Sequence, residues 1–166
     1  EKNKIILLTH GGWGAALIKS MGLLVGKTEN IMDIGLTANM TLDQYMLKIE
    51  NSVMPVNKNT IVLTDIPGGT TSNVALRLTQ KYPWTILSGV NALMLVETIM
   101  HQNEDITAEI VKKILEAGQQ KVKDKNMNVV LCRVDSRLIH GQVVTKWVGQ
   151  YNVNRIIVVS DQLEKD

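Results

Sequence analysis

Short apolar runs alternate with amphipathic segments along the N-terminal part of the chain. Continuous apolar runs are typical of strands buried on both faces, and apolar positions spaced three and four apart are typical of helices. The pattern predicts strands at residues 4–9, 30–36, 60–64 and 85–90. It predicts helices at residues 13–26, 42–53, 74–81, 91–101 and 108–123. Thr41 and Thr107 precede two of these helices and are predicted N-caps.

This alternation of strands and helices predicts an α/β fold. Because helices join successive strands, we expect a doubly wound, mainly parallel four-stranded sheet with right-handed crossovers and helices on both faces. In the expected strand order, 2-1-3-4, the first and third strands are neighbours. The helices that follow these two strands then lie on opposite faces of the sheet.

The strand–helix pattern starts again at Asn128 and continues to the end of the chain. A short charged stretch precedes it, and the roughly 40 residues that follow are too few to bury a core alone. We therefore interpret them as a truncated β-α-β piece of a second α/β domain. The predicted parts are a first domain at residues 1–122, a linker at 123–127 and the second segment at 128–166.

The composition and charge of the chain argue against several classes of protein and of site. The formal net charge is only +2, too small for the basic surface of a typical nucleic-acid-binding protein. No apolar stretch reaches the roughly 20 residues that a membrane-spanning helix needs, so we expect a cytoplasmic protein. The single cysteine, Cys132, excludes an internal disulfide and is interpreted as a buried core thiol. The histidines are far apart in the sequence, and no metal site is predicted.

Two side chains with catalytic potential follow the strands that are expected to be neighbours. His10 follows the first strand and Asp65 follows the third. In open α/β sheets, ligands bind at the carboxyl edge where the strand order reverses. A carboxylate that accepts one ring N–H of a histidine fixes its tautomer and leaves the other nitrogen free for nucleophilic attack. His10 and Asp65 are therefore a candidate catalytic pair.

Two glycine-bearing turns flank this pair and lead into helices. Backbone N–H groups at helix N-termini bind phosphate, and glycines let the backbone approach it. With a nucleophilic histidine, these turns indicate phosphoryl transfer through a phosphohistidine. Neither G-x-G-x-x-G nor a Walker motif is present, and no cofactor is predicted. The candidate phosphate-binding residues of these turns are Gly11, Gly68, Gly69, Thr70 and Ser72.

A second cluster has the sequence R-V-D-S-R-L-I-H-G-Q at residues 133–142. Arginines can clamp a phosphoryl group bidentately while a histidine receives it. His140 is therefore a second candidate catalytic residue, and Arg133 and Arg137 are candidate phosphate ligands.

Simpler interpretations of these residues stay open at this point. His10 could be incidental, Asp65 could cap a turn, and the second cluster could be a charged surface loop with a helix-capping histidine. His101 ends a predicted helix, where a cation interacts favourably with the helix dipole, and we assign it a structural role.

These motifs resemble the mannose/fructose/sorbose family of the bacterial sugar phosphotransferase system (PTS). The segment at 133–142 resembles the phosphorylated loop of its enzyme IIB domains. The stretches L-L-T-H-G, L-T-D-I-P-G-G-T-T-S-N and S-G-V-N-A-L-M-L-V-E-T resemble its enzyme IIA. The chain is thus similar to a IIAB protein, with a complete IIA domain fused to the N-terminal part of a IIB domain.

The resemblance implies a phosphoryl relay. His10 would accept a phosphoryl group from the phosphocarrier protein HPr, usually on the ε nitrogen, with Asp65 orienting the ring. His140 would take it next, usually on the δ nitrogen, and the sugar would receive it during import through the membrane IIC and IID subunits. The resemblance also implies a homodimer that exchanges a fifth strand, near residues 121–126, and attachment to the inner face of the cell membrane through the permease complex.

The chain departs from the family pattern in several places. Ile66 and Pro67 stand where an aromatic residue is common, and Thr70 replaces a common serine. The linker is nearly absent, and the IIB segment is much shorter than a family IIB domain, so His140 is expected to depend on the missing part. The alternative hypothesis is a non-catalytic regulatory domain that uses the same fold to dimerise and report phosphorylation state.

Overall fold

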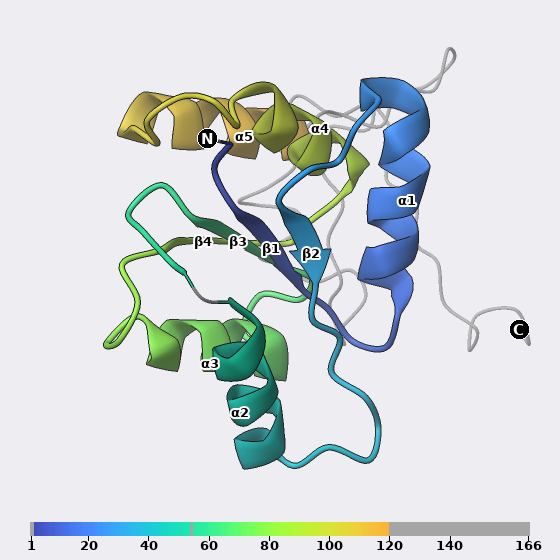
Figure 1. Ribbon diagram of the computed structural model, residues 1–166, viewed down its shortest axis with the longest axis vertical. Coiled ribbons are helices and arrows are strands. Elements are labelled where there is room, and N and C mark those ends of the chain that lie inside the picture. Colours follow the sequence, from blue (N-terminus) through green and yellow to red (C-terminus); the bar gives the residue numbers. More distant parts are fainter. Residues whose placement is uncertain (1, 54, 120–166) are drawn as a thin grey trace, which may run out of the picture. The chain divides into compact units, whose positions relative to one another are not determined.

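The computed structural model describes residues 2–53 and 55–119, in which strands and helices alternate as predicted (Figure 1). The strands are β1 (Ile5–Leu8), β2 (Ile31–Asp33), β3 (Ile61–Thr64) and β4 (Thr85–Ser88). The helices are α1 (Trp13–Val25), α2 (Leu42–Val53), α3 (Thr70–Leu78), α4 (Ala92–Met100) and α5 (Ala108–Gly118).

The strands form a parallel sheet in the order β2-β1-β3-β4, which confirms the predicted fold class and strand order. Ile5 of β1 pairs with Ile31 on one side and with Ile61 on the other. Every residue of β1 and β3 is buried, which explains why these strands are continuous apolar runs in the sequence. The central strands end together, because Leu8 pairs with Thr64.

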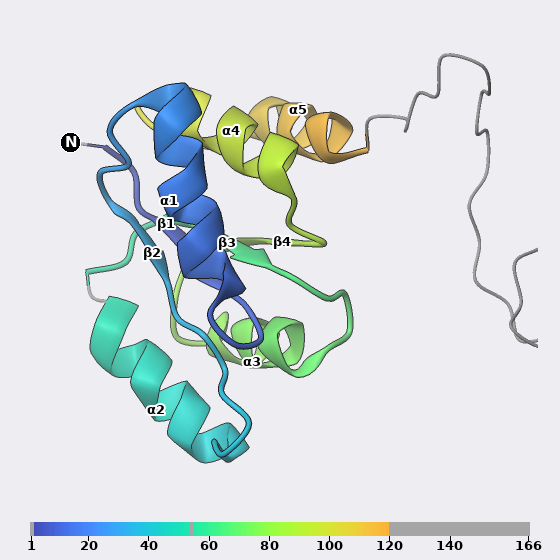
Figure 2. The same cartoon turned by 90° about the vertical axis from the view of Figure 1, so that its right-hand side faces the viewer.

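Helices cover both faces of the sheet. Helices α1, α4 and α5 lie on one face, and α2 and α3 lie on the other (Figures 1 and 2). Side chains of β1 alternate between the two cores: Ile6 and Leu8 pack on the α2–α3 face, and Ile5 and Leu7 pack on the opposite face. Burial of each such side chain stabilises the fold by about 2 kcal/mol relative to exposure.

Side chains cap three of the described helices at their N-termini. Thr41 Oγ1 accepts from the Gln44 backbone N–H at 3.2 Å, and Gln44 Oε1 accepts from the Thr41 N–H at 2.9 Å. This reciprocal capping box starts α2. The side chains of Asn91 and Thr107 accept from N–H groups in the first turns of α4 and α5. The predicted caps Thr41 and Thr107 are therefore confirmed.

The boundaries of α3 differ from the prediction. The helix begins at Thr70 rather than after Asn73, so the glycine turn is shorter than expected. It ends at Leu78 rather than near Lys81, and the chain leaves the helix through tight turns in which the Thr79 N–H donates to the Leu76 carbonyl.

Strands β2 and β4 are shorter than predicted, and a glycine follows each. After β2, a Cβ on Gly35 would lie 2.1 Å from the Gly11 carbonyl oxygen, so only glycine fits. The chain rejoins the sheet at one isolated bridge between His10 and Leu36. After β4, Gly89 has a φ of +88°, which ends the strand two residues before the predicted boundary at residue 90.

Residues 120–166 lie outside the described part of the chain. The predicted linker, the strand expected near residues 121–126, the end of the last predicted helix and the segment 128–166, with Cys132, all fall there and stay predictions. None of the helices described has the length and the apolar character that crossing a membrane requires.

Candidate active site

The sheet brings His10 and Asp65 together at the carboxyl edge of its central strands. Asp65 Oδ2 lies 2.8 Å from His10 Nδ1, and it also accepts a hydrogen bond from the His10 backbone N–H at 2.7 Å. The pairing of Leu8 with Thr64 explains this contact, because the residues that follow paired strand ends emerge side by side. Two bonds from one residue fix the carboxylate relative to the ring.

Donors surround both oxygens of the Asp65 carboxylate. Besides His10, Oδ2 faces Trp13 Nε1 at 3.4 Å. Oδ1 accepts from Thr71 Oγ1 at 2.7 Å and from the Ile66 backbone N–H at 2.9 Å. Burial by itself raises the pKa of Asp65, but the hydrogen bonds from His10 and Thr71 outweigh it and lower that pKa to about 2. Asp65 is therefore ionised at neutral pH.

The ionised carboxylate determines which ring nitrogen of His10 is free. Because a carboxylate only accepts hydrogen bonds, Nδ1 of the neutral ring carries the proton and Nε2 holds a lone pair. The His10 side chain is 41% exposed, whereas that of Asp65 is 6% exposed. A buried anion thus orients a ring that remains accessible to a reactant, which is the arrangement of an activated nucleophile.

Two helices begin beside this pair with glycine at the N-cap position. The N-cap residues of α1 and α3, Gly12 and Gly69, make no side-chain hydrogen bond. The turns that lead to them pass through Gly11 at a φ of +70° and Gly68 at +75°, where other residues are strained. Free N–H groups and the positive end of the helix dipole attract anions. This end of the site therefore suits a phosphoryl group.

An open hollow of about 650 Å³ lies beside His10. Its walls come from the turn after β1, the loop after β2 and the start of α3. The residues that line it are His10, Gly11, Leu36, Thr37, Ala38, Met40, Leu42 and Thr70. Of the predicted phosphate-binding residues, Gly11 and Thr70 thus border the same space as the histidine.

The Ser72 hydroxyl is turned into the protein. Ser72 Oγ donates to the Ile66 carbonyl oxygen at 2.7 Å and lies 2.6 Å from Thr64 Oγ1 and 3.1 Å from Ser88 Oγ. These contacts tie the start of α3 to β3 and β4. The hydroxyl of Ser72, a predicted phosphate-binding residue, is therefore engaged within the protein.

A second carboxylate, Asp33, lies near the start of α1 and was missed from the sequence. Asp33 Oδ1 accepts from Thr9 Oγ1 at 2.7 Å, and the carboxylate also accepts from the Ala15 backbone N–H. Burial raises the pKa of Asp33. A Cβ on Gly14 would lie 2.2 Å from Asp33 Oδ1, so the helix needs glycine here. The sequence did contain one signal for Asp33: it is an acidic residue inside a strand that is predicted to be buried.

Thr71 and Trp13 are the other contacts of Asp65 that the sequence did not single out. Trp13 is the first residue of a predicted helix, and Thr71 lies in the glycine-bearing turn before another predicted helix. The hydroxyl of Thr71 is identifiable as a partner of Asp65 only once the start of α3 is known.

The other described histidine, His101, lies apart from the site at the C-terminus of α4. Its ring nitrogens contact Glu97 Oε1 at 3.1 Å and Glu104 Oε1 at 2.8 Å, which fits the predicted structural role. Across residues 2–53 and 55–119, no group of three or more His, Cys, Asp and Glu side chains is arranged to hold a metal ion.

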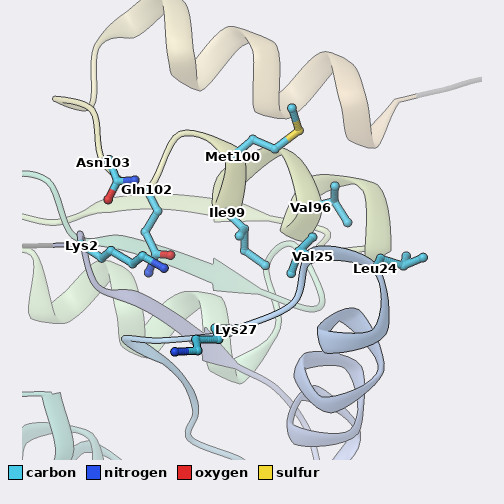
Figure 3. A pocket seen from close by; sticks show the side chains of 9 residues that line it. All are labelled: Lys2, Leu24, Val25, Lys27, Val96, Ile99, Met100, Gln102 and Asn103. Carbon is cyan, nitrogen blue, oxygen red and sulfur yellow. The ribbon is translucent and has the colours of Figure 1, made fainter.

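A second hollow, of about 490 Å³, lies between the C-terminal turn of α1 and α4 (Figure 3). Leu24, Val25, Val96, Ile99 and Met100 supply most of its apolar lining. Leu24 is 74% exposed, so the apolar stripe of α1 extends beyond the buried core. Among the residues that the structure describes, none of the predicted site residues lines this hollow, so the candidate active site is the His10 edge of the sheet.

The predicted residues of the second cluster, His140, Arg133 and Arg137, lie outside the described part of the chain. Their roles stay predictions.

Two family models match this sequence. Residues 4–115 match the family described as the PTS system fructose IIA component. Residues 129–166 match the PTS system sorbose subfamily IIB component.

Curated relatives agree with both matches. The PTS system mannose-specific EIIAB component of Escherichia coli (strain K12) is 31% identical over an alignment 199 positions long. This alignment covers 98% of this chain and 61% of the relative. This chain therefore spans only about 61% of that relative's length. The PTS system fructose-specific EIIB component of Bacillus subtilis (strain 168) is 52% identical over 40 residues, 24% of each chain.

Solved structures share the fold. Phosphotransferase system component EIIA from Streptococcus agalactiae superposes with a TM-score of 0.63 at 28% identity, covering 69% of this chain and 91% of its own. The mannose/sorbose specific IIA subunit from Enterococcus faecalis has a TM-score of 0.65 at 24% identity, covering 81% of this chain and 100% of its own, and supports the fold alone. The chain therefore belongs to the PTS fructose IIA component family, whose role is phosphoryl transfer in sugar transport, and a sorbose-subfamily IIB segment follows the IIA part.

Proposed function

We propose that this chain accepts a phosphoryl group from phospho-HPr on His10 Nε2 and passes it to His140 of a IIB domain. The observation that carries the proposal is the 2.8 Å contact between His10 Nδ1 and a carboxylate with a pKa of about 2. That contact commits the ring proton to Nδ1 and leaves Nε2 as the nucleophile.

The transfer step follows from this geometry. The lone pair of His10 Nε2 attacks the phosphorus of the donor phosphohistidine, and the new N–P bond forms as the donor's P–N bond breaks. The donor ring nitrogen keeps the bonding electron pair. The proton on Nδ1 stays in its hydrogen bond, and Asp65 stabilises the positive charge that develops on the ring.

The residues around the ring have distinct parts in the proposal. Backbone N–H groups that follow Gly11 and Gly69 lie at helix N-termini whose N-cap residues make no side-chain hydrogen bond, and they would hold the phosphoryl oxygens, apart from the N–H of Ala15, which donates to Asp33. Thr70 borders the same hollow as His10 and would add its hydroxyl. Arg133 and Arg137 would hold the group at His140. In this proposal, these residues of the chain carry out the phosphoryl transfer that is the role of the family.

The wider setting of the proposal follows the family. The IIA domain would span residues 1–122, with a linker at 123–127 and a IIB segment at 128–166. It would act in the cytoplasm as a homodimer and associate with membrane IIC and IID subunits at the inner face of the cell membrane.

The test is phosphorylation by phosphoenolpyruvate, enzyme I and HPr, followed by intact mass and acid treatment. We expect the wild-type chain to gain acid-labile phosphate and His10→Ala to gain none. His140→Ala should still be phosphorylated at His10. His101→Gln is the matched control, because it removes a histidine that contacts carboxylates away from the site, and it should behave as wild type.

Two results would contradict the proposal. A wild-type chain that takes up no acid-labile phosphate would favour the non-catalytic regulatory alternative. Full incorporation into His10→Ala would show that the acceptor is another residue.

A further inference from the structure

Thr71 touches the catalytic carboxylate from the side opposite His10. It is the second residue of α3, its side chain is fully buried, and its hydroxyl donates to Asp65 Oδ1 at 2.7 Å. His10 contacts the other oxygen, Oδ2. The two oxygens of Asp65 therefore have separate tasks: one is anchored to α3 and the other faces the ring.

This anchor determines how the carboxylate is rotated. The other donor to Oδ1 is the backbone N–H of Ile66, the residue next to Asp65, which moves with the same turn. Thr71 belongs to a helix whose first turn is itself tied down, since Ser72 Oγ donates to the Ile66 carbonyl and Asn73 Nδ2 to the Gly68 carbonyl at 3.1 Å. Thr71 is thus the side chain that links the carboxylate to the helix.

The hydroxyls of Thr71 and its neighbour Thr70 differ in what they contact. The Thr71 hydroxyl proton is used in the bond to Asp65, so it is not available to donate to a phosphoryl oxygen. Thr70 borders the hollow beside His10 and has the free access that Thr71 lacks. Adjacent threonines therefore face different partners.

We propose that Thr71 is a positioning residue, which holds the Asp65 carboxylate in the rotation that keeps His10 in its Nδ1–H tautomer. The inference rests on the proposed function for its effect on phosphoryl transfer. Its effect on the ring does not depend on that function. Without the Thr71 hydroxyl, Oδ1 keeps only a local bond, and rotation of the carboxylate weakens the contact of Oδ2 with Nδ1.

The test compares Thr71→Val, which removes the hydroxyl at nearly constant volume, with Thr71→Ser, which retains it. Nitrogen-15 NMR of the ring, at a pH where His10 is neutral, measures the fraction of the Nδ1–H tautomer. We expect this fraction to fall in Thr71→Val and to return in Thr71→Ser. The rate constant of phosphorylation by phospho-HPr should fall about tenfold in the valine variant with KM unchanged, and the serine should restore it.

Thr98→Val is the matched control. Thr98 is a buried threonine of α4 whose hydroxyl donates to the Met94 carbonyl at 2.7 Å, on the opposite face of the sheet. Its substitution should change stability without altering the His10 tautomer. If Thr71→Val does not fold, Thr71→Ala and Thr71→Ser provide the same comparison.

The outcomes separate this inference from the proposed function. A wild-type tautomer fraction in Thr71→Val, a serine variant that fails to restore it, or an equal change in Thr98→Val would each overturn the positioning role. A wild-type protein that takes up no phosphate would overturn the proposed function, while the tautomer comparison would still decide the role of Thr71.

Discussion

Asp65→Asn tests the centre of the site, because it removes charge while keeping the shape of the side chain. The Asp65 carboxylate is 6% exposed and accepts from His10, Thr71 and neighbouring N–H groups. Asparagine has one acceptor oxygen where aspartate has two, so its amide NH₂ group must face a donor. The variant should therefore lose stability at neutral pH and lose control of the His10 tautomer.

The pKa of Asp65 gives the size of the effect. Folding lowers this pKa from 3.8 to about 2, which corresponds to about 2 kcal/mol of stabilisation. A carboxyl group with a lowered folded pKa binds its proton less readily in the native state. Its stabilisation is therefore fully present above pH 4 or so and is lost as the pH falls through about 2.

Urea unfolding between pH 7 and pH 2 measures this contribution. The free energy of unfolding of wild type should exceed that of Asp65→Asn by about 2 kcal/mol at pH 7, and the gap should narrow below pH 4. Asp33→Asn is a control of opposite sign. Because burial raises the pKa of Asp33, its ionised form destabilises the fold. The free energy of unfolding of Asp33→Asn should therefore exceed that of wild type at pH 7, and this difference should disappear in acid.

The same variant has a kinetic consequence. Phosphoryl transfer to Asp65→Asn should be slower by up to about 10⁴-fold, as in other sites where an amide selects the wrong histidine tautomer. A gap in unfolding free energy that stays constant from pH 7 to pH 2, or an unchanged transfer rate, would refute the orienting role of Asp65.

Three further substitutions test the surrounding structure. Gly14→Ala should destabilise the protein by about 1–3 kcal/mol in urea, because its Cβ would lie 2.2 Å from Asp33 Oδ1; an unchanged midpoint would contradict this close approach. Tyr45→Phe removes a buried 2.7 Å bond to a carbonyl of the loop after β2 and should cost about 1–3 kcal/mol, seen as a lower Tm. Asn91→Ala removes the α4 cap and a 2.9 Å bond to the last carbonyl of α5, at a cost of about 1–2 kcal/mol in stability. Hydrogen exchange of the α5 amides should accelerate. Unchanged exchange would argue against the stabilisation of α5 by Asn91.

The strand order and the meeting of His10 with Asp65 were predictable because they depend on backbone topology. Fully apolar runs mark strands covered on both faces, and the ends of neighbouring parallel strands meet at one edge of the sheet. His10 and Asp65 each follow such a run after a single threonine. The position along the chain is then enough to bring them together.

The partners of Asp65 were not predictable in the same way, because they depend on where a helix begins. The start of α3 at Thr70 directs Thr71 to Asp65 and Ser72 into the interior, where it meets Thr64. If α3 began after Asn73, the hydroxyls of Thr70, Thr71 and Ser72 would all lie in a loop. Helix boundaries are set by local cap geometry and by tertiary contacts that sequence spacing does not contain.

The proposed function requires the site to hold a phosphoryl group next to an aspartate whose pKa is lowered to about 2. In the proposed function, the geometry of the ring keeps these two anions apart. Asp65 lies on the Nδ1 edge of His10, whereas the phosphoryl group would be bonded to Nε2 on the opposite edge. The donors around Asp65 disperse its charge, and the start of α3, whose N-cap residue makes no side-chain hydrogen bond, offers positive potential to the phosphoryl oxygens. The carboxylate can therefore orient and polarise the ring without preventing its phosphorylation.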